Sequence, residues 1–549
     1  MDKYTIGIDF GTDSVRAIVV DVKTGHVISE CVASYPRWAK GLYRHPDKNI
    51  FRQHPLDYLE AMTQCVSGAL AALSADSRRQ IVGIGVDTTG STPVAVDQNG
   101  VPLALLEEFS ECEDAMFYLW KDHSAQKEAD AINAAFSSAA VDYRKYQGAY
   151  SAEWYWAKIL HAVKSRPILR ARAYTWVEHC DWIVGVLCGN TAPNTLYRSA
   201  CAAGHKALWH SSWNGLPDRE TLESIDPYLA VIRDRYTVSP KPATARAGLL
   251  NIEWADKWGL PHDVVISGCS FDAHAGAVGA GIREGVIVCT VGTSAVELAV
   301  ARPERLAGTS LGAYGGQAED SILPGLIGIE AGQAAFGDIF AWFRDLLLWP
   351  LDRLRAEDKN TYDAIADGLL TQLGSAAAAL DDSTFPIALD WFNGRRYPNT
   401  DDQQRAAIAG LSLAVDAPAL YRALVFSAVS GMKRILDGFV QSGIPVERVL
   451  AVGGISKKSP YIMQMMADLL EIPVTTVCVD QTCALGAAMY AAVASNCYPS
   501  LPVASAAMAA DQAETFVPDP SKKPFYHKKY LKYLHLASAV DTLHTSDAP

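Results

Sequence analysis

The sequence has no CxxC pair, and its 11 cysteines are scattered along the chain, with Cys478 and Cys483 the closest two. In a long chain without an export signal, this pattern indicates reduced thiols in a cytosol. We expect each cysteine to be a small, buried apolar residue rather than a functional one.

Long apolar runs and an excess of positive charge are also missing. No 18 apolar residues follow one another without a charge, and the N-terminus has no apolar segment of signal-peptide length. We therefore expect no membrane span and a cytoplasmic location. The net charge of −13 disfavours a nucleic-acid partner, because binding the phosphate backbone needs a basic surface. It still allows a small anionic ligand in a local pocket.

What the chain does have is length and a regular alternation of strands and helices. Its 549 residues exceed the roughly 250–300 residues at which one hydrophobic core stops growing, so two large domains are expected. Apolar strands separated by helical patterns predict an α/β fold. The expected strands are 4–8, 15–21, 81–86, 264–267, 286–289, 296–300 and 449–452, and the expected helices are 55–73, 151–165, 418–441, 460–470 and 522–538.

Two stretches about half a chain apart have the same sequence pattern. TIGIDFGTDSVRAIVVD and VIVCTVGTSAVELAVA each contain an apolar strand, a Gly-Thr turn and a second apolar strand. Such a repeat favours two related domains, although hairpins with Gly-Thr turns also arise by chance. The boundary is expected near residues 281–285, giving domains 1–283 and 284–549.

The first of these turns places an acid beside a run of small and polar residues. Asp9 ends the strand, and Gly11 and Thr12 follow it. Gly11 lets the backbone approach a ligand, and successive N–H groups of a tight turn bind anions. Because an acid beside an anion needs a cation between them, Asp9 is a candidate Mg²⁺ ligand next to phosphate. A plain hairpin, in which Asp9 accepts turn N–H bonds, is the alternative.

Two further glycine turns could bind the same ligand. Gly292 and Thr293 repeat the first turn but have no acid, so they could hold phosphate without metal. Gly453 and Gly454 follow a strand and precede a helix, and would allow close approach of adenosine, although an ordinary connection explains them equally well. The chain has neither GxxxxGKS/T nor GxGxxG, so P-loop and dinucleotide sites lack their motifs.

The candidate general base is Asp272, at the end of a predicted strand and the start of a small-residue helix. Open α/β sheets bind ligands at the carboxyl ends of their strands, where a carboxylate could take a proton from a hydroxyl that attacks a phosphoryl group. The local sequence favours a simpler role as a helix N-cap. A second motif, GTSLG at 308–312, fits GxSxG around Ser310, but it lacks the flanking strand and helix and is expected to be a loop.

Taken together, these residues resemble the FGGY family of carbohydrate kinases over nearly the whole chain. The matching blocks include IGIDFGTDSVRA, VGIGVDTTGSTP, MFYLWKDHSA, SAEWYWAKILH, AGHKALWH, FDAHAGAVGAG, GIEAGQAAFGDIFAWF, DWFNGRRYPN and DQTCALGAAMYAA. DWFNGRR and AGHKALWH are similar to the branch of the family that phosphorylates ribulose.

The resemblance implies two ribonuclease H-like domains, akin to actin and hexokinase, around a central cleft. The first would bind mainly sugar and the second mainly nucleotide. ATP and Mg²⁺ would be used to phosphorylate L-ribulose at its 5-hydroxyl during L-arabinose breakdown, and a homodimer is expected. The implied roles are metal binding for Asp9, catalysis for Asp272, sugar binding for Gly90, Lys206, Asp272 and Glu330, and nucleotide binding for Gly11, Thr12, Gly292, Thr293, Gly453, Gly454 and Ser459.

The chain departs from the family at two points, and two other functions stay open. Ser459 stands where the family often has an amide near adenosine, and Phe426 stands where a helix often carries Glu. A kinase of the same fold acting on D-ribulose, ribitol or xylulose is one alternative. A non-catalytic, actin-like protein that binds ATP or sugar is the other.

Overall fold

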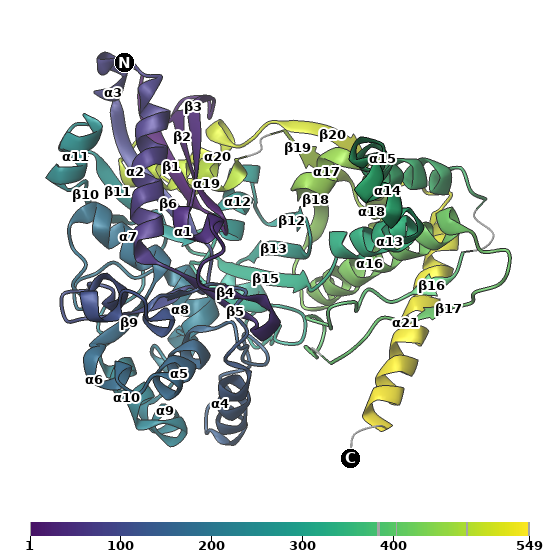
Figure 1. Cartoon of the computed structure of the whole chain (residues 1–549), viewed down its shortest axis with the longest axis horizontal. Helices are drawn as coiled ribbons and strands as arrows, with labels where there is room; N and C mark the ends of the chain where they lie inside the picture. The colour runs from purple at the N-terminus through teal and green to yellow at the C-terminus, as the bar shows by residue number, and fades with distance from the viewer. Residues whose placement is uncertain (1, 382–384, 402, 479–480, 547–549) are drawn as a thin grey trace.

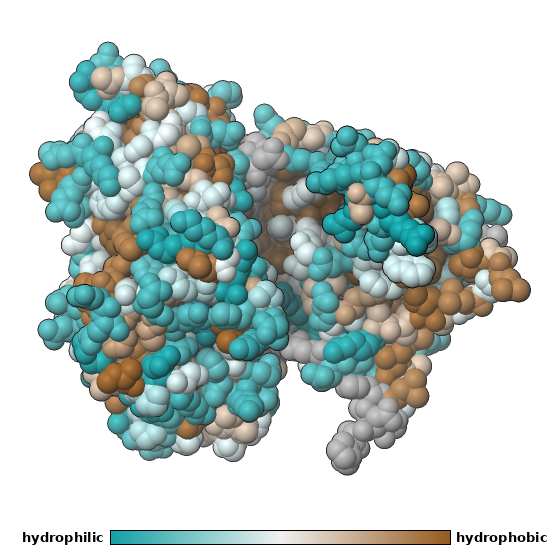
Figure 2. Space-filling view, in the orientation of Figure 1, coloured by the Kyte–Doolittle hydropathy of each residue, from teal (hydrophilic) through white to brown (hydrophobic). Residues whose placement is uncertain are grey.

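The computed structural model describes residues 2–381, 385–401, 403–478 and 481–546. Figure 1 shows two lobes, with the N-terminal half on the left in purple to teal and most of the C-terminal half on the right in green. The space-filling view shows a groove between the two lobes (Figure 2). Within the described residues, no helix combines the length and the apolar character that crossing a membrane requires.

The N-terminal lobe is built on a six-stranded mixed sheet in the order β10-β11-β6-β1-β2-β3. Strands β11, β6 and β1 are parallel, and β2, β3 and β10 run antiparallel to their neighbours. The parallel strands β1, β6 and β11 are buried on both faces over nearly all of their length, as parallel strands covered by helices require. The bounds are Tyr4–Phe10 (β1), Ser14–Asp21 (β2), Val27–Ser34 (β3), Ile81–Thr88 (β6), Arg246–Leu249 (β10) and Val265–Phe271 (β11).

The C-terminal lobe repeats this arrangement. Its seven-stranded sheet has the order β14-β15-β13-β12-β18-β19-β20, with β12, β18 and β19 parallel. The hairpin β12–β13 occupies the place of β1–β2, so the internal similarity predicted from the two Gly-Thr turns is a similarity of fold. The bounds are Gly285–Val291 (β12), Ala295–Ala301 (β13), Gly316–Glu319 (β14), Ile327–Gln333 (β15), Val446–Val452 (β18), Val474–Val477 (β19) and Gln512–Phe516 (β20).

Helices cover the outer face of each sheet. Helices α2 (Pro55–Ala71) and α7 (His179–Cys188) pack on the N-terminal sheet, and α16 (Ala417–Gln441) and α18 (Pro460–Leu470) pack within the core of the C-terminal lobe. A separate helical cluster lies at the bottom left of Figure 1 and includes α5 (Tyr155–Ser165).

The predicted helices are confirmed with small shifts of their ends. Helix α5 begins at Tyr155 and not at Ser151, because the N–H of Glu153 bonds to the Ser151 hydroxyl in a turn. The last helix, α21, runs over Lys523–Ser546 and is longer than the predicted 522–538. The motif around Ser310 lies outside helices and strands, as expected, and its hydroxyl donates to the carbonyl of Lys145 at 2.5 Å.

Two helices lie between the sheets and share one apolar core with both. They are α12 (Asp272–Ala280), which follows the last parallel strand of the N-terminal sheet, and α19 (Thr482–Ala494), which comes from the C-terminal half but packs on the N-terminal sheet. Glycines make this contact close. A Cβ on Gly7 would lie 1.8 Å from the carbonyl oxygen of Ala484, and one on Gly85 would lie 1.9 Å from that of Ala487.

We expect Gly85→Ala to lower the free energy of unfolding by about 1–3 kcal/mol, the usual cost of overpacking. Neither the strand nor the α19 backbone can yield without separating the two elements. Gly368→Ala is the control, because its Cβ would meet only the flexible end of Gln372 and alanine favours a helix. Thermal unfolding compares the two variants, and an unchanged midpoint for Gly85→Ala would contradict this packing.

Candidate active site

Three carboxylates gather at the carboxyl ends of the parallel strands β1, β6 and β11. Asp9 pairs with Asp87 across β1 and β6, and Asp272 directly follows β11. Sequence reasoning found Asp9 and Asp272 but missed Asp87. The signal was present, because IGVD, which ends at Asp87, repeats IGID, which ends at Asp9. The strand pairing that brings the two together becomes visible only in the fold.

The three acids have few partners. Asp9 accepts an ion-paired hydrogen bond from Arg16 at 2.9 Å through Oδ2. Its Oδ1 and both oxygens of Asp87 are buried and have no hydrogen-bond partner among the described residues. Burial, together with the charges of Asp9 and Asp272, raises the pKa of Asp87 well above its ordinary value. Buried acids that accept no hydrogen bond from an N–H or hydroxyl donor are rare in proteins, and the adjacent oxygens of Asp9 and Asp87 suit a cation.

These oxygens fit a hard divalent cation. Ligand atoms of Asp9, Asp87 and Cys483 lie within 4.8 Å of one another. Mg²⁺ takes one or two carboxylates together with phosphate oxygens and water, whereas a thiol is a soft ligand that it does not favour. The two carboxylates could therefore hold Mg²⁺, with Cys483 as a neighbour and not a ligand. This pair extends the metal site predicted at Asp9 alone.

Asp272 is the first residue of α12, and its position corrects the capping interpretation. Phe271 occupies the N-cap and makes no side-chain cap bond. Asp272 Oδ1 accepts the N–H of the adjacent residue, Ala273, at 2.7 Å, whereas an N-cap side chain would accept from the second or third helical N–H. Burial, and next the charge of Asp9, raise the pKa of Asp272 to about 7. Such a carboxyl can both take and hold a proton near neutral pH.

The two Gly-Thr hairpins have the same local turn. In the first, the N–H of Gly11 donates to the carbonyl of Ser14 at 3.0 Å. In the second, the N–H of Gly292 donates to the carbonyl of Ser294 at the same distance. Each turn is also held from outside: Trp120 Nε1 donates to Thr12 Oγ1 at 3.0 Å. The carbonyl of Thr293 accepts the N–H groups of Phe336 and Asp338, at the start of α13 (Gly337–Leu348), at 2.9 and 3.1 Å.

The predicted sugar residues meet around one aromatic ring. Lys206 Nζ donates to Glu330 Oε1 at 3.0 Å and lies 5.7 Å from the ring centre of Phe271. Gly90 packs on the same ring, where a Cβ would come within 1.9 Å of it. Since Asp272 follows Phe271, the candidate base lies next to this group. Lys206 comes from the N-terminal lobe and Glu330 from β15, so the pair joins the lobes.

The Lys206–Glu330 pair has a defined charge state. Burial opposes ionisation of Glu330, but Lys206, with smaller effects of His205 and His274, holds the pKa of Glu330 below its ordinary value. A second pair joins the lobes at Glu153, which contacts Arg396 at 3.2 Å and His123 at 2.9 Å. The two pairs together present two cations, Lys206 and Arg396, and two carboxylates, Glu330 and Glu153, where the lobes meet, which suits the recognition of sugar hydroxyls.

The third glycine turn lies beside the second hairpin. Gly453 has a φ of +102°, and a Cβ on it would lie 2.6 Å from the carbonyl of Val291, the residue before Gly292. Gly454 begins α17 (Gly454–Lys458), and Ser459 Oγ caps α18 by accepting the N–H of Ile462 at 3.4 Å. The Ser459 hydroxyl thus has a local partner, which weakens the case for it as a nucleotide contact.

Models of two adjoining domains match almost the whole chain. The N-terminal domain of the FGGY family of carbohydrate kinases matches residues 4–279, and its C-terminal domain matches residues 287–495. A ribulokinase from Vibrio parahaemolyticus is 43% identical over 548 residues, covering 98% of this chain and 96% of that protein. A ribulokinase from Halalkalibacterium halodurans is 33% identical, covering 97% and 94%.

Solved structures are similar at lower identity. A xylulose kinase from Rhodospirillum rubrum has a TM-score of 0.81 at 20% identity, and covers 98% of this chain and 99% of that one. A glycerol kinase from Plasmodium falciparum, solved with ADP, has a TM-score of 0.76 at 17% identity, with 97% and 98% covered. At these identities the likeness concerns the fold, which agrees with the expected pair of related α/β domains.

Proposed function

Because this chain belongs to the FGGY family of carbohydrate kinases, we propose that it is a ribulokinase, which transfers the γ-phosphoryl group of ATP to the 5-hydroxyl of L-ribulose. The observation that carries the proposal is end-to-end similarity to relatives named ribulokinase, among them two at 43% and 33% identity. The product, L-ribulose 5-phosphate, would serve L-arabinose breakdown. A cytoplasmic location and a homodimer are further proposals from the family resemblance.

In the proposed mechanism, Asp272 takes the proton of the sugar hydroxyl as that oxygen attacks the γ-phosphorus. Its raised pKa suits this role, and Phe271 places it beside Lys206 and Glu330. Lys206 would donate to sugar hydroxyls and Glu330 would accept from them, and the Gly90 turn, which packs on Phe271, would line the same site. Otherwise, phosphoryl transfer mainly requires the protein to position the reacting groups and to neutralise phosphate charge.

The nucleotide would lie between the two hairpins, with Gly11, Thr12, Gly292 and Thr293 against its phosphates. Gly453 and Gly454 would lie along adenosine, with Ser459 nearby. Mg²⁺ held by Asp9 and Asp87 would neutralise phosphate charge when bound. Closure of the lobes, joined at Lys206–Glu330, would exclude water so that ATP is not simply hydrolysed.

A panel of sugars tests this function. ADP release is measured with L-ribulose, D-ribulose, xylulose and ribitol at saturating MgATP. We expect kcat/KM for L-ribulose to exceed the others by at least about tenfold, since a site that hydrogen-bonds hydroxyls discriminates against misplaced ones. Preference for another sugar would reassign the substrate. ATP binding without sugar-stimulated ADP release would instead indicate a non-catalytic binding protein.

A further inference from the structure

Helix α5 carries a lysine that is buried from all sides. Lys158 is 0% exposed, and its ammonium donates to three backbone carbonyls: Ser91 at 2.7 Å, Leu119 at 2.9 Å and Tyr118 at 3.4 Å. Lysine is among the residues least often buried, so such a position calls for a specific reason. The ammonium has three donors, and the three carbonyls match them.

One of these carbonyls belongs to the turn that would line the sugar. Ser91 follows Gly90, and Lys158 holds its carbonyl from one side. Glu178, at the end of β9 (Thr175–Glu178), holds the same turn from the other side: its carboxylate accepts from the Ser91 hydroxyl and, at 2.7 Å, from the Thr92 N–H. Two buried side chains, Lys158 and Glu178, thus hold from opposite sides the turn that packs on Phe271.

The other two carbonyls lead to the first phosphate hairpin. Leu119 precedes Trp120, whose Nε1 donates to Thr12 Oγ1 at 3.0 Å. Gln53 donates from β5 (Ile50–Gln53) to the carbonyl of Thr12 at 2.7 Å. Lys158 binds the carbonyls of Tyr118 and Leu119, directly before Trp120. The conformation of these residues therefore determines where the Trp120 indole meets Thr12.

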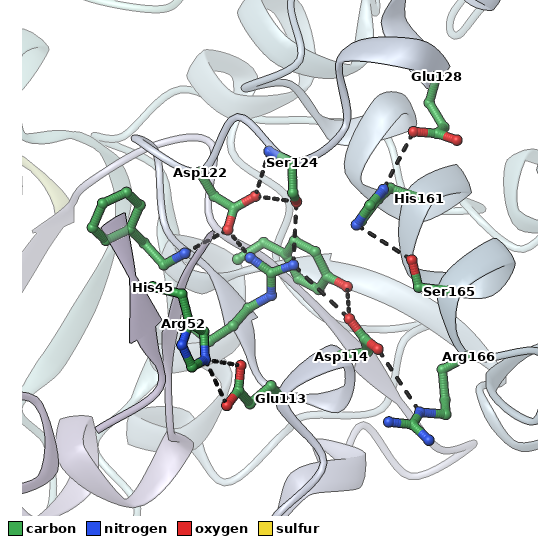
Figure 3. Close-up of polar contacts among 12 residues, drawn as sticks. His45, Arg52, Glu113, Asp114, Asp122, Ser124, Glu128, His161, Ser165 and Arg166 are labelled. Carbon is green, nitrogen blue, oxygen red and sulfur yellow. Dashed lines mark hydrogen bonds and ion pairs between the residues drawn. The ribbon is translucent and has the colours of Figure 1, made fainter. Parts of the chain in front are cut away.

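The residues that follow Trp120 are held by a buried ion pair between Arg52 and Asp122. Figure 3 shows the Asp122 carboxylate in contact with both Arg52 and Ser124. The same carboxylate accepts the N–H of Phe51 at 2.6 Å. Both members of the Arg52–Asp122 pair are buried. Trp120 is thus fixed on both sides, by Lys158 before it and by Asp122 after it, and cannot shift without breaking buried contacts.

We propose that Lys158 is a positioning residue that couples the sugar turn at Gly90 to the phosphate hairpin at Thr12. It touches neither substrate; it sets the distance between the two surfaces on which they would bind. The proposal rests on the proposed function, which assigns sugar to the Gly90 turn and phosphate to Thr12. A 1 Å misplacement of reacting groups can lower the rate on the order of 10²-fold. A single residue that positions both binding surfaces can therefore have a large effect on the rate.

The central test is Lys158→Met, which keeps the chain length and removes the three donors. We expect KM for L-ribulose and the dissociation constant of a non-hydrolysable ATP analogue to rise together, each by at least about tenfold. Lys158→Arg should restore part of both, since it keeps the charge but not the compact ammonium. Analogue binding is measured without sugar, so a wrong sugar assignment would leave this half of the test intact.

Two variants that each affect one of the two binding surfaces distinguish coupling from a nonspecific loss of structure. Glu178→Gln weakens the contacts that hold the Ser91–Thr92 turn and leaves the bond from Lys158 to the Leu119 carbonyl in place, so it should raise KM for L-ribulose without weakening the binding of the analogue. Trp120→Phe removes the hydrogen bond to Thr12. It should raise the dissociation constant of the ATP analogue without changing KM for L-ribulose. If Lys158→Met does not fold, Lys158→Arg must still shift both constants together, and a shift in one alone would contradict the proposal.

A matched control comes from the C-terminal lobe. Arg422 is 4% exposed and donates to the carbonyls of Leu380 and Asp381 at 3.1 and 3.3 Å. Arg422→Met therefore removes a buried, carbonyl-bound cation away from the site, and should lower the thermal midpoint while both constants stay at wild-type values. Equal constants for wild type and folded Lys158→Met, or the same kinetic change in Arg422→Met, would overturn the proposal.

Discussion

Asp272→Asn is expected to reduce kcat by 10²- to 10⁴-fold, the usual contribution of a general base. The amide oxygen of asparagine can still accept the N–H of Ala273, the bond that Asp272 makes at 2.7 Å, so the start of α12 should be preserved. ATP binding should change little. Steady-state ADP release, nucleotide titration and thermal unfolding of the variant measure these three expectations.

The control for this variant is Asp352→Asn. Asp352 also begins a helix, α14 (Asp352–Glu357), but it is exposed and lies outside the candidate site. We expect wild-type kcat from it. A folded Asp272→Asn enzyme with full turnover would show that another group accepts the proton. That result would rule out Asp272 as the general base.

The pH dependence of the reaction follows from the same carboxyl. Burial and Asp9 raise the pKa of Asp272 to about 7, and the base must be ionised to act. Activity should therefore fall tenfold per pH unit as the pH drops below that pKa. A cation on Asp9 would remove the second cause, so kcat/KM with MgATP should show an acid limb at or below about pH 7. Residual activity of Asp272→Asn should lack this limb.

Much of the framework could be predicted from local patterns. Apolar runs predicted the strands β1, β2 and β12. The repeated Gly-Thr turn indicated a duplicated fold without any knowledge of which strands pair. Asp9 was recognisable because an acid ended a buried strand. These features depend on neighbours in the sequence, where burial and turn chemistry leave a direct signature.

Other features depend on pairing between distant segments. Asp87 became part of the site only when β6 paired with β1, and the role of Asp272 depended on helix α12 starting one residue earlier than a cap would require. Lys158 lies in a helical pattern in which a lysine would normally face solvent. Its burial follows from the packing of α5 against two turns from elsewhere in the chain.

Asp87→Asn is expected to separate metal binding from stability. Burial and the charges of Asp9 and Asp272 raise the pKa of Asp87, so its ionised form is disfavoured in the folded protein. The contribution of such a group to stability is fully present below its unfolded pKa, and it is lost as the pH rises from there through the raised folded pKa. Asparagine stays neutral at every pH, so without metal the variant should be more stable at high pH, by about 1 kcal/mol.

The same change removes one of two carboxylates that would hold Mg²⁺. Affinity for the cation should fall on the order of 10- to 100-fold, which titration of the apoprotein with Mn²⁺ followed by electron paramagnetic resonance can measure without turnover. Asp57→Asn is the comparison, since Asp57 is equally buried but accepts the N–H groups of Arg37 and Trp38. It should lose stability and keep the metal. A stabilised Asp87→Asn protein with undiminished Mn²⁺ binding would place the cation elsewhere and leave Asp87 without a ligand.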